Sequence, residues 1–296
     1  MENSVLNIEQ EAETLAFEDI VERIETDGYC RIPQVYTPEQ AQATLDLAQD
    51  WYEKTKDTLA DDRPALARED PFLWNPQNKD IRFLEMLFRP PIIDEVLKHF
   101  LNDPWFKQIP QDEPNYILRN LLVRSSHKRL PMHIDSLLPY AGEHIFVMQA
   151  SIILEDQSEA NGCTVVVPGS HTSGEYVDQS AFDIAIPLET RAGDVVIWDS
   201  RIWHGARENK TDGTRWAMIG TFTRWWLKQM FNITDNMPQE IYEQLTDSQK
   251  AVMGFCSIPH NNEQEGIDMK RGYDSLLTDV SGYRCQEILP WKGRVA

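Results

Sequence analysis

The sequence predicts an α+β fold with a mainly β core, in which an N-terminal helical layer precedes a jelly roll and C-terminal helices follow it. Helical periodicity dominates the first third of the chain, short strand-like runs begin near residue 115, and helix-start signals return after residue 235. Many short strands without intervening helices are typical of an antiparallel sandwich or barrel, and this texture predicts the jelly roll.

The charge balance argues against nucleic-acid and membrane partners. The 296 residues include 28 basic and 48 acidic side chains, which give a net charge of −20. Such a surface repels polyanions. The N-terminus lacks a basic region followed by an apolar run, and no apolar stretch reaches the roughly 18 residues of a membrane span. We expect a soluble, cytoplasmic protein. Its four cysteines form no CxxC pair and are expected to be buried thiols: Cys30, Cys163, Cys256 and Cys285.

The chain is expected to form one domain over residues 1–296. The polar and acidic start is typical of a flexible tail. The expected order is a tail over 1–15, the helical layer over 16–114, the jelly-roll core over 115–225, and C-terminal helices and loops over 226–296.

The first elements have clear local signals. Apolar residues at helical spacing predict a short helix from Phe17 to Thr26, and Asp27-Gly28 then turns the chain into a strand over Tyr29–Ile32. A second helix begins at Thr37, which can cap it, with Pro38 in the first turn and Gln40 closing a capping box. Its apolar stripe is expected to face a sheet: Ala41, Leu45, Ala48 and Tyr52.

Residues 58–80 are rich in Asp, Arg, Pro and Asn, and are expected to form a long loop. This loop is either a lid or an ordinary surface connection. Two helices are expected next, over Ile81–Phe88 and Ile92–Leu101, because Pro90-Pro91 separates them.

The predicted strands are separated by Gly, Pro, Asn and Asp turns. They cover Tyr116–Arg124, Ile145–Leu154, Cys163–Val167, Ala185–Leu188, Asp194–Trp198 and Arg215–Thr223. The last helices are expected over Pro238–Gln244 and Thr246–Met253, the second with a capping box and a stop at Gly254.

The stretch PMHIDSLLPY contains the candidate metal ligands. His133 and Asp135 are two residues apart, so on an extended strand their side chains share one face. His204 follows a later strand-like run and is a candidate third ligand. Two histidines and one carboxylate on one side of a metal are the arrangement of non-haem Fe(II) oxygenases. A lone His-x-Asp is a weak signal, and the order of the surrounding motifs strengthens it.

These motifs together resemble one known family. The segments HID (133–135), NGCTVVVPGSH (161–171) and GDVVIWDSRIWHGA (193–206), with Arg215, are similar to the phytanoyl-CoA dioxygenase family of Fe(II)/2-oxoglutarate oxygenases. DGYCRIPQVYTPEQ (27–40) is similar to the strand-then-helix entry of that family, so the resemblance spans about Ile20 to Thr223.

The resemblance implies a fold, an activity and roles for residues. The fold is a double-stranded β-helix, and the iron ligands are His133, Asp135 and His204. The implied activity uses O2 and 2-oxoglutarate to oxidise a small molecule, with hydroxylation as the default outcome and release of succinate and CO2. The carboxylate of Asp135 argues against halogenation, because relatives that halogenate have a small residue there. Arg215 would bind the distal carboxylate of 2-oxoglutarate.

Three positions near the implied site leave alternatives open. Gln149 and Asn120 either contact the cosubstrate or are ordinary strand residues. Many relatives have a hydroxyl residue at position 206, where this chain has Ala206, so Thr221 or a water is expected to complete the carboxylate site.

The sequence gives only hints about the substrate. Four basic residues precede the metal motif, and they either orient an anionic substrate or form a solvated basic loop: Arg119, Arg124, Lys128 and Arg129. Four aromatic residues either line a pocket or belong to the core: Tyr140, Trp203, Trp225 and Trp226.

Two other functions remain as alternatives. One is a catalytically silent jelly-roll protein for binding or sensing, which would be expected to lose a ligand or Arg215. The other is a cupin-type metal-dependent isomerase or hydrolase, although cupin sites usually contain more histidines. Only the oxygenase would consume 2-oxoglutarate in an iron-dependent way.

Overall fold

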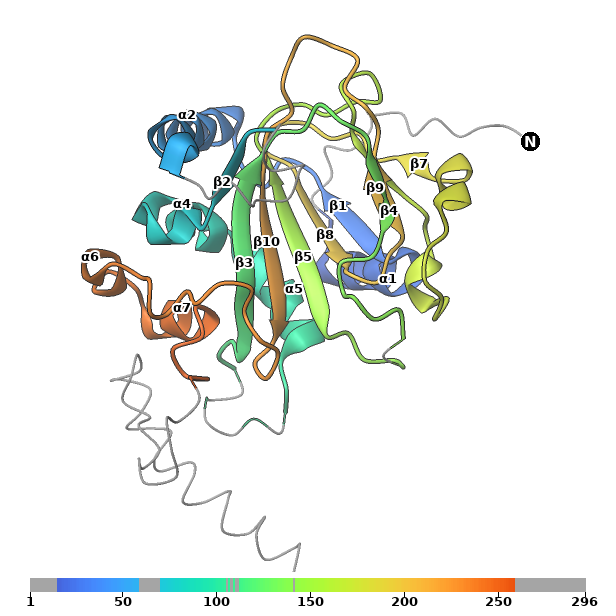
Figure 1. Ribbon diagram of the computed structural model, residues 1–296. Coiled ribbons are helices and arrows are strands. Elements are labelled where there is room, and N and C mark those ends of the chain that lie inside the picture. The colour runs from blue at the N-terminus through green and yellow to red at the C-terminus, as the bar shows by residue number, and fades with distance from the viewer. Residues whose placement is uncertain are drawn as a thin grey trace, which may run out of the picture.

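The computed structural model describes residues 15–58 and 70–258, except 105, 107, 108, 110, 111 and 141. Two antiparallel sheets face each other, and helices cover the outer face of the larger sheet (Figure 1). The predicted α+β fold with a jelly-roll core is confirmed. Most of the expected tail and Cys285 lie outside the described residues. Cys30 and Cys163 are buried and Cys256 is partly buried.

The larger sheet has the strand order β1-β8-β5-β10-β3-β2, with every neighbouring pair antiparallel. Its central strands are buried on both faces, because helices cover one side and the smaller sheet faces the other. The strands are β1 Tyr29–Ile32, β2 Phe72–Trp74, β3 Tyr116–Arg124, β5 Val147–Ile153, β8 Val195–Asp199 and β10 Ala217–Arg224.

The smaller sheet has the order β4-β9-β6-β7 and lies opposite β5 and β8. Its strands are short: β4 Leu130–His133, β6 Thr164–Val166, β7 Ile186–Pro187 and β9 His204–Ala206. His204 follows strand β8, as predicted, and it begins a short strand of its own, because the turn after β8 sends the chain into the smaller sheet.

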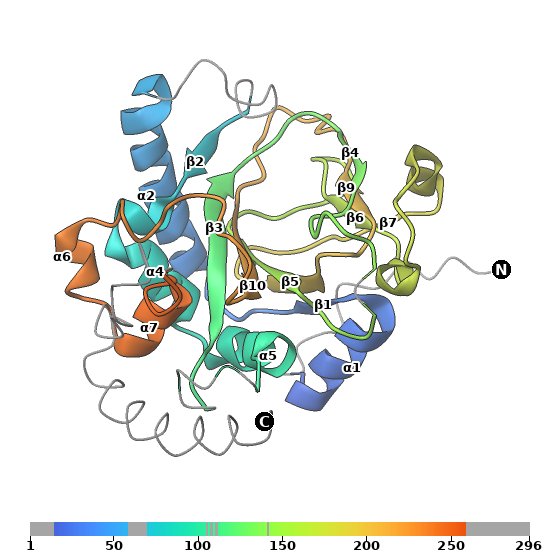
Figure 2. The same cartoon turned by 60° about the horizontal axis from the view of Figure 1, so that its bottom comes forward.

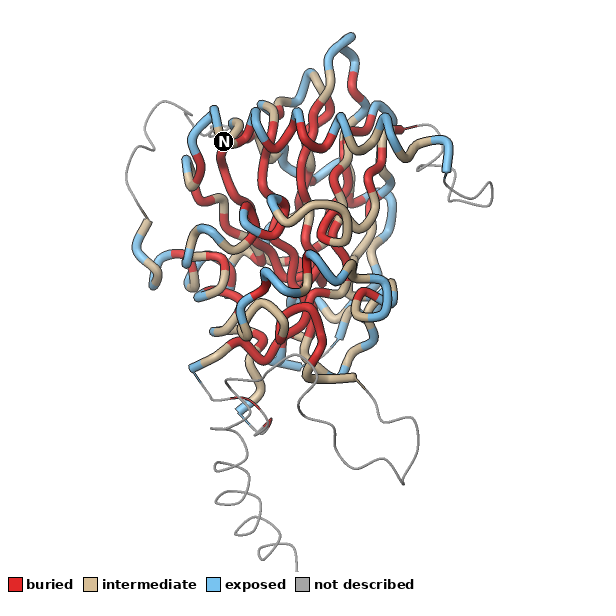
Figure 3. Tube along the Cα trace, turned by 90° about the vertical axis from the view of Figure 1, so that its left-hand side faces the viewer, coloured by how far each residue is buried: buried red, intermediate tan, exposed pale blue. Residues whose placement is uncertain are grey.

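The helices form a layer against the larger sheet, on the side away from the smaller one (Figure 2). They are α1 Phe17–Asp27, α2 Pro38–Thr55, α4 Ile81–Phe88 and α5 Pro91–Leu101, with α6 Gln239–Tyr242 and α7 Asp247–Val252 near the end of the described chain. The main hydrophobic core joins this layer to the sheet, and buried residues concentrate there (Figure 3). In the described ranges, no helix combines the length and apolar character needed to cross a membrane.

Local signals explain where the helices begin and end. The capping boxes at Thr37 and Thr246 are both present, as predicted. Helix α1 ends at Gly28, whose φ of 86° favours glycine. Gly193 is required for a different reason: its φ is 95°, and a Cβ there would lie 2.2 Å from the carbonyl oxygen of Tyr36. In the α2 stripe, three residues are buried and Tyr52 is partly buried, with its ring edge-on to Trp216.

The prediction of a long loop over 58–80 is wrong for its second half. Residues 72–74 form β2, which pairs with β3 at the edge of the larger sheet, and Phe72 and Leu73 are buried. The composition of 58–80 predicted a loop because the three residues of this strand are outnumbered by the Asp, Arg, Pro and Asn residues around them. The segment 16–114 therefore contributes two edge strands, β1 and β2, as well as helices. Residues 59–69 lie outside the described residues, so the alternatives of a lid or a surface connection remain predictions from the sequence.

The other predicted elements are confirmed with small shifts at their ends. Strands β1 and β3 and helix α4 match their predicted ranges, and α5 begins one residue earlier, at Pro91. The last strand begins at Ala217, two residues later than predicted. Arg215 therefore precedes β10, and its backbone N–H donates to Ser125 Oγ at 2.9 Å, next to the end of β3.

Candidate metal centre and cavity

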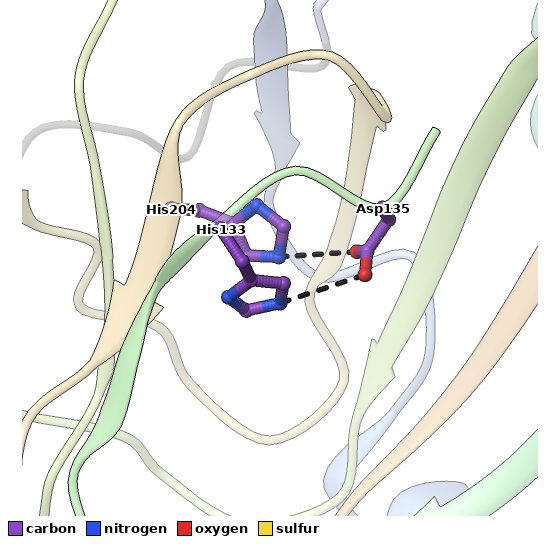
Figure 4. Close-up of side chains that lie close together, drawn as sticks. All are labelled: His133, Asp135 and His204. Atoms are coloured by element: carbon purple, nitrogen blue, oxygen red, sulfur yellow. Dashed lines mark ion pairs between the residues drawn. The ribbon is translucent and has the colours of Figure 1, made fainter. Parts of the chain in front are cut away.

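Three potential ligands converge between the two sheets (Figure 4). His133 ends β4 and His204 begins β9, and the two residues are directly paired in the smaller sheet. His204 Nε2 lies 3.1 Å from Asp135 Oδ2, and His133 Nε2 lies 3.5 Å from Asp135 Oδ1. One donor atom from each residue lies within 4.8 Å of the other two. This donor set suits a divalent transition metal and leaves coordination positions open for other ligands.

Asp135 reaches the site by a different route from the one predicted. It lies in the loop after β4, so the two-residue spacing on a strand does not account for its position. Instead, the backbone N–H groups of Asp135 and Ser136 both donate to the carbonyl of Ser200, at 2.8 and 3.0 Å. Since Ser200 follows β8, this contact bends the chain back toward His204.

The hydrogen bonds of both imidazoles favour metal binding through Nε2. His133 Nδ1 lies 2.8 Å from the carbonyl oxygen of Pro131, and His204 Nδ1 lies 3.0 Å from that of Ile202. A carbonyl can only accept, so each Nδ1 carries the proton. In the neutral rings, each Nε2 then has a lone pair that points toward Asp135, where a metal would lie.

Gln149 supports the carboxylate. It lies on β5 with 6% of its surface exposed, and its side-chain amide donates to Asp135 Oδ2. This bond holds one oxygen of Asp135 in a fixed orientation. The sequence suggested that Gln149 could contact the cosubstrate. Its position facing the metal ligands is consistent with this, and the contact in the structure is to Asp135.

Replacing Gln149 by Ala is expected to lower the affinity for Fe(II) by about 10- to 100-fold, the usual cost of removing a partner of a metal ligand. The affinity can be measured under anaerobic conditions by competition with a chromophoric chelator. Ser151→Ala is the matched control, because Ser151 lines the cavity two residues further along β5 and does not contact the three ligands. Equal affinities for the two variants would contradict the role of Gln149.

Mutual interaction shifts the pKa values within the cluster. Burial alone would raise the pKa of Asp135, but the His204 charge and hydrogen bonds from both histidines outweigh burial and lower that pKa. For His133, burial lowers the pKa, and the hydrogen bond and charge of Asp135 outweigh it and raise the pKa above 6.5. The metal-free cluster is therefore stabilised as a carboxylate beside a protonated imidazole.

Iron binding should consequently weaken as the pH falls. A metal must displace the proton from His133, and the raised pKa of His133 means that this proton is held up to a higher pH than on an ordinary imidazole. Below that pKa, we expect the Fe(II) affinity to fall by about tenfold per pH unit for each proton displaced. Anaerobic titrations between pH 8 and pH 6 would measure the slope. A constant affinity over this range would contradict the prediction.

The ligands open into a cavity of about 460 Å³ between the sheets. This volume is within the range typical of small-molecule sites. One row of the larger sheet lies beneath the ligands, because Thr221 on β10 is paired with both Gln149 and Asn120. All three line the cavity. Asn120 thus faces the same space as the ligands.

Arg215 also lines the cavity and has 6% of its surface exposed. Its Nε and Nη2 atoms are buried without a hydrogen-bond partner in the described part of the chain. An unpaired buried guanidinium is costly. Burial, with the nearby charge of Arg124 as the next cause, lowers the pKa of Arg215 to about 10, so the side chain remains a cation at neutral pH. These free donors fit an anionic group such as a carboxylate.

Three threonine hydroxyl groups line the cavity and are candidates to complete the carboxylate site that lacks a hydroxyl at Ala206. Thr221 lies six residues beyond Arg215, which corresponds to roughly 20 Å of extended chain. Thr164 is paired directly with Ala206, and Thr190 has a buried hydroxyl with no partner among the described residues. All three hydroxyl groups line the cavity, and Thr164 is placed best to complete a site near Ala206 because it is paired with that residue.

The basic segment before the metal motif divides between cavity and surface. Arg119 and Arg124 line the cavity, whereas Lys128 and Arg129 are exposed outside it. The four aromatic residues considered from the sequence do not line it. Trp74 and Trp198 do, from β2 and β8. Trp74 was missed because its strand was taken for a loop, and Trp198 because it lies inside a predicted core strand.

Comparisons with known proteins place the chain in a family. The model of the phytanoyl-CoA dioxygenase (PhyH) family matches residues 24–217. Dioxygenase af480 of Aspergillus fumigatus is 25% identical over 276 residues, which are 88% of this chain and 84% of that protein. HygX from Streptomyces hygroscopicus, solved with nickel and 2-oxoglutarate bound, has a TM-score of 0.54 at 17% identity and covers 73% of this chain and 90% of its own. The epimerase SnoN from nogalamycin biosynthesis has a TM-score of 0.53 at 19% identity, over 70% of this chain and 82% of its own.

Proposed function

The chain belongs to the phytanoyl-CoA dioxygenase family of Fe(II)/2-oxoglutarate-dependent oxygenases, and we propose that it hydroxylates a small organic molecule. The observation that carries this proposal is the content of one cavity. Two histidines and one carboxylate converge at its wall, and a buried arginine without a protein partner lies in the same space. A metal and a carboxylate-bearing cosubstrate together would satisfy both groups.

In this proposal His133, Asp135 and His204 hold Fe(II), each through one donor atom. The carbonyl groups that accept from Nδ1 of each histidine leave Nε2 free to bind the metal. Gln149 orients the carboxylate of Asp135. Bound Fe(II) and 2-oxoglutarate supply the oxidising chemistry, in which O2 is consumed, succinate and CO2 are released, and a substrate C–H bond becomes C–OH.

Arg215 anchors the distal carboxylate of 2-oxoglutarate through its free guanidinium N–H groups. Asn120 and Thr221 face the remaining space from the larger sheet and are available to contact the cosubstrate or the substrate. The apolar lining from Ile153, Val196 and Ile219 excludes water from the reacting groups.

The substrate is proposed to be a small molecule that carries an anionic group. Arg119 supports this, because it is partly exposed and lines the cavity, and its side chain has no hydrogen bond or ion pair among the described residues. Met230 and Leu137 also line the cavity and are exposed, so an apolar body would fit beside this charge.

The test is iron-dependent turnover of 2-oxoglutarate. Purified protein with Fe(II), O2 and 2-oxoglutarate should release succinate even without the substrate, at the low rate of uncoupled reaction, and Asp135→Ala should abolish this release. Binding of 2-oxoglutarate without any succinate would instead support a silent sensing protein. Metal binding without 2-oxoglutarate affinity would favour a cupin-type isomerase or hydrolase.

A further inference from the structure

Two arginines lie side by side at one end of the cavity. Arg124 ends β3, directly opposite Ala217 at the start of β10, and Arg215 lies two residues before Ala217. The backbone N–H of Arg215 donates to the side chain of Ser125, the residue that follows Arg124. Both arginine side chains line the same cavity. The chain therefore places two guanidinium groups at one end of the site.

Neither guanidinium has a hydrogen-bonding partner among the described residues. That of Arg124 lies over the ring of Phe72, 4.8 Å from its centroid, and this contact leaves its N–H edge free. The charge of the neighbouring carboxylate, Asp70, raises the pKa of both arginines, but both Asp70 oxygens accept hydrogen bonds from other groups. Its Oδ2 accepts from Ser126 Oγ at 2.6 Å, and its Oδ1 accepts from the backbone N–H of His127 at 3.1 Å.

Two adjacent cations repel each other, and here Arg215 is buried and Arg124 is half-buried. Burial lowers the pKa of both arginines, and the charge of Arg124 lowers the pKa of Arg215 further. A protein does not gain stability from such a pair, so a bound anion is the most direct explanation for keeping it. The anion must fit between two guanidinium groups and must reach the same cavity as the three potential metal ligands.

We propose that Arg124 is a second arginine for the distal carboxylate of 2-oxoglutarate, so that Arg124 and Arg215 bind this group together. The inference rests on the proposed function. Ala206 lines the same cavity and has no hydroxyl to offer the carboxylate, whereas Arg124 is a charged donor. A carboxylate has two oxygens, so each arginine can donate to one of them.

Arg124→Met tests the proposal, because methionine keeps an apolar stem over Phe72 and removes the charge. We expect the Kd for 2-oxoglutarate, measured by anaerobic calorimetry on the Fe(II)-loaded protein, to rise by about 10- to 100-fold. The Kd for 2-oxobutyrate, which lacks the distal carboxylate, should not change. Without any 2-oxo acid, the variant should melt about 2 to 4 °C higher than the wild type, because the repulsion is removed.

Matched variants separate this role from a general effect of charge or folding. Arg129→Met removes one charge from the same segment outside the cavity, and it should leave the 2-oxoglutarate Kd unchanged. Arg124→Lys, which keeps the charge, should give an intermediate Kd and serves if Arg124→Met does not fold.

Three results would overturn the proposal. The first is a Kd for 2-oxoglutarate within twofold of the wild type in Arg124→Met, while Arg215→Gln still binds weakly. This result would show that Arg215 binds the distal carboxylate without Arg124. An equal loss for 2-oxoglutarate and 2-oxobutyrate would indicate a structural role. Failure of the wild type itself to bind 2-oxoglutarate would reject the proposed function and this inference together.

Discussion

Alanine at any of the three metal-site positions is expected to lower the Fe(II) affinity by more than about 100-fold, which exceeds the usual cost of losing only a partner of a ligand. The variants are His133→Ala, Asp135→Ala and His204→Ala. Each removes one of three donor atoms that lie within 4.8 Å of one another, so the two remaining ligands would bind iron only weakly. Anaerobic competition with a chromophoric chelator measures the loss, and 2-oxoglutarate turnover should disappear with it.

His144→Ala provides the matched control for these variants. His144 is exposed and does not belong to the group that His133, Asp135 and His204 form, so its removal should leave the Fe(II) affinity unchanged. Far-UV circular dichroism should show that all variants keep their secondary structure. An Fe(II) affinity within threefold of the wild type in either His133→Ala or Asp135→Ala would show that the ligand assignment is wrong.

The second large effect is expected at Arg215. Arg215→Gln should raise the Kd for 2-oxoglutarate by about 100-fold or more, because truncating one partner of a buried, hydrogen-bonded charge pair costs about 2–5 kcal/mol. Arg215→Lys should recover only part of this loss, since a lysine cannot form the two parallel hydrogen bonds of a guanidinium.

The Fe(II) affinity separates the cosubstrate role of Arg215 from a general disturbance of the site. In Arg215→Gln it should remain at the wild-type value, because Arg215 is not one of the three potential ligands. An unchanged Kd for 2-oxoglutarate in this variant would remove the cosubstrate role while leaving the iron site intact. A parallel loss of iron binding would point instead to damage of the whole cavity.

The sequence predicts best those elements whose signals are local. The capping residues Thr37 and Thr246 mark their helices, and the run Tyr116–Arg124 is long enough to be recognised as a strand from composition alone. Strand β2 was missed because it has three residues and exists through pairing with β3. Such pairing depends on residues roughly 50 positions away and leaves little trace in a local window.

The candidate site was predictable in its residues but not in its geometry. Ordered motifs singled out His133, Asp135 and His204, and the structure brings them together. The route of Asp135 depends on a hydrogen bond to Ser200 that no spacing rule describes. Arg124 could have been linked to Asn120, because residues 120, 122 and 124 alternate on one strand and share a face. What the alternation cannot show is that Arg215, from the segment before β10, lies beside Arg124.

An anaerobic titration of the metal-free protein, first with Fe(II) and then with 2-oxoglutarate, tests the proposed iron and cosubstrate site most directly when it is followed by visible absorption. Direct binding of 2-oxoglutarate to protein-bound Fe(II) produces a weak metal-to-ligand charge-transfer band, and no substrate is needed to see it. We expect the band to appear and saturate at one equivalent in the wild type, and to be absent in His204→Ala. A folded wild-type protein that binds Fe(II) and shows no band at saturating 2-oxoglutarate would contradict the proposed function.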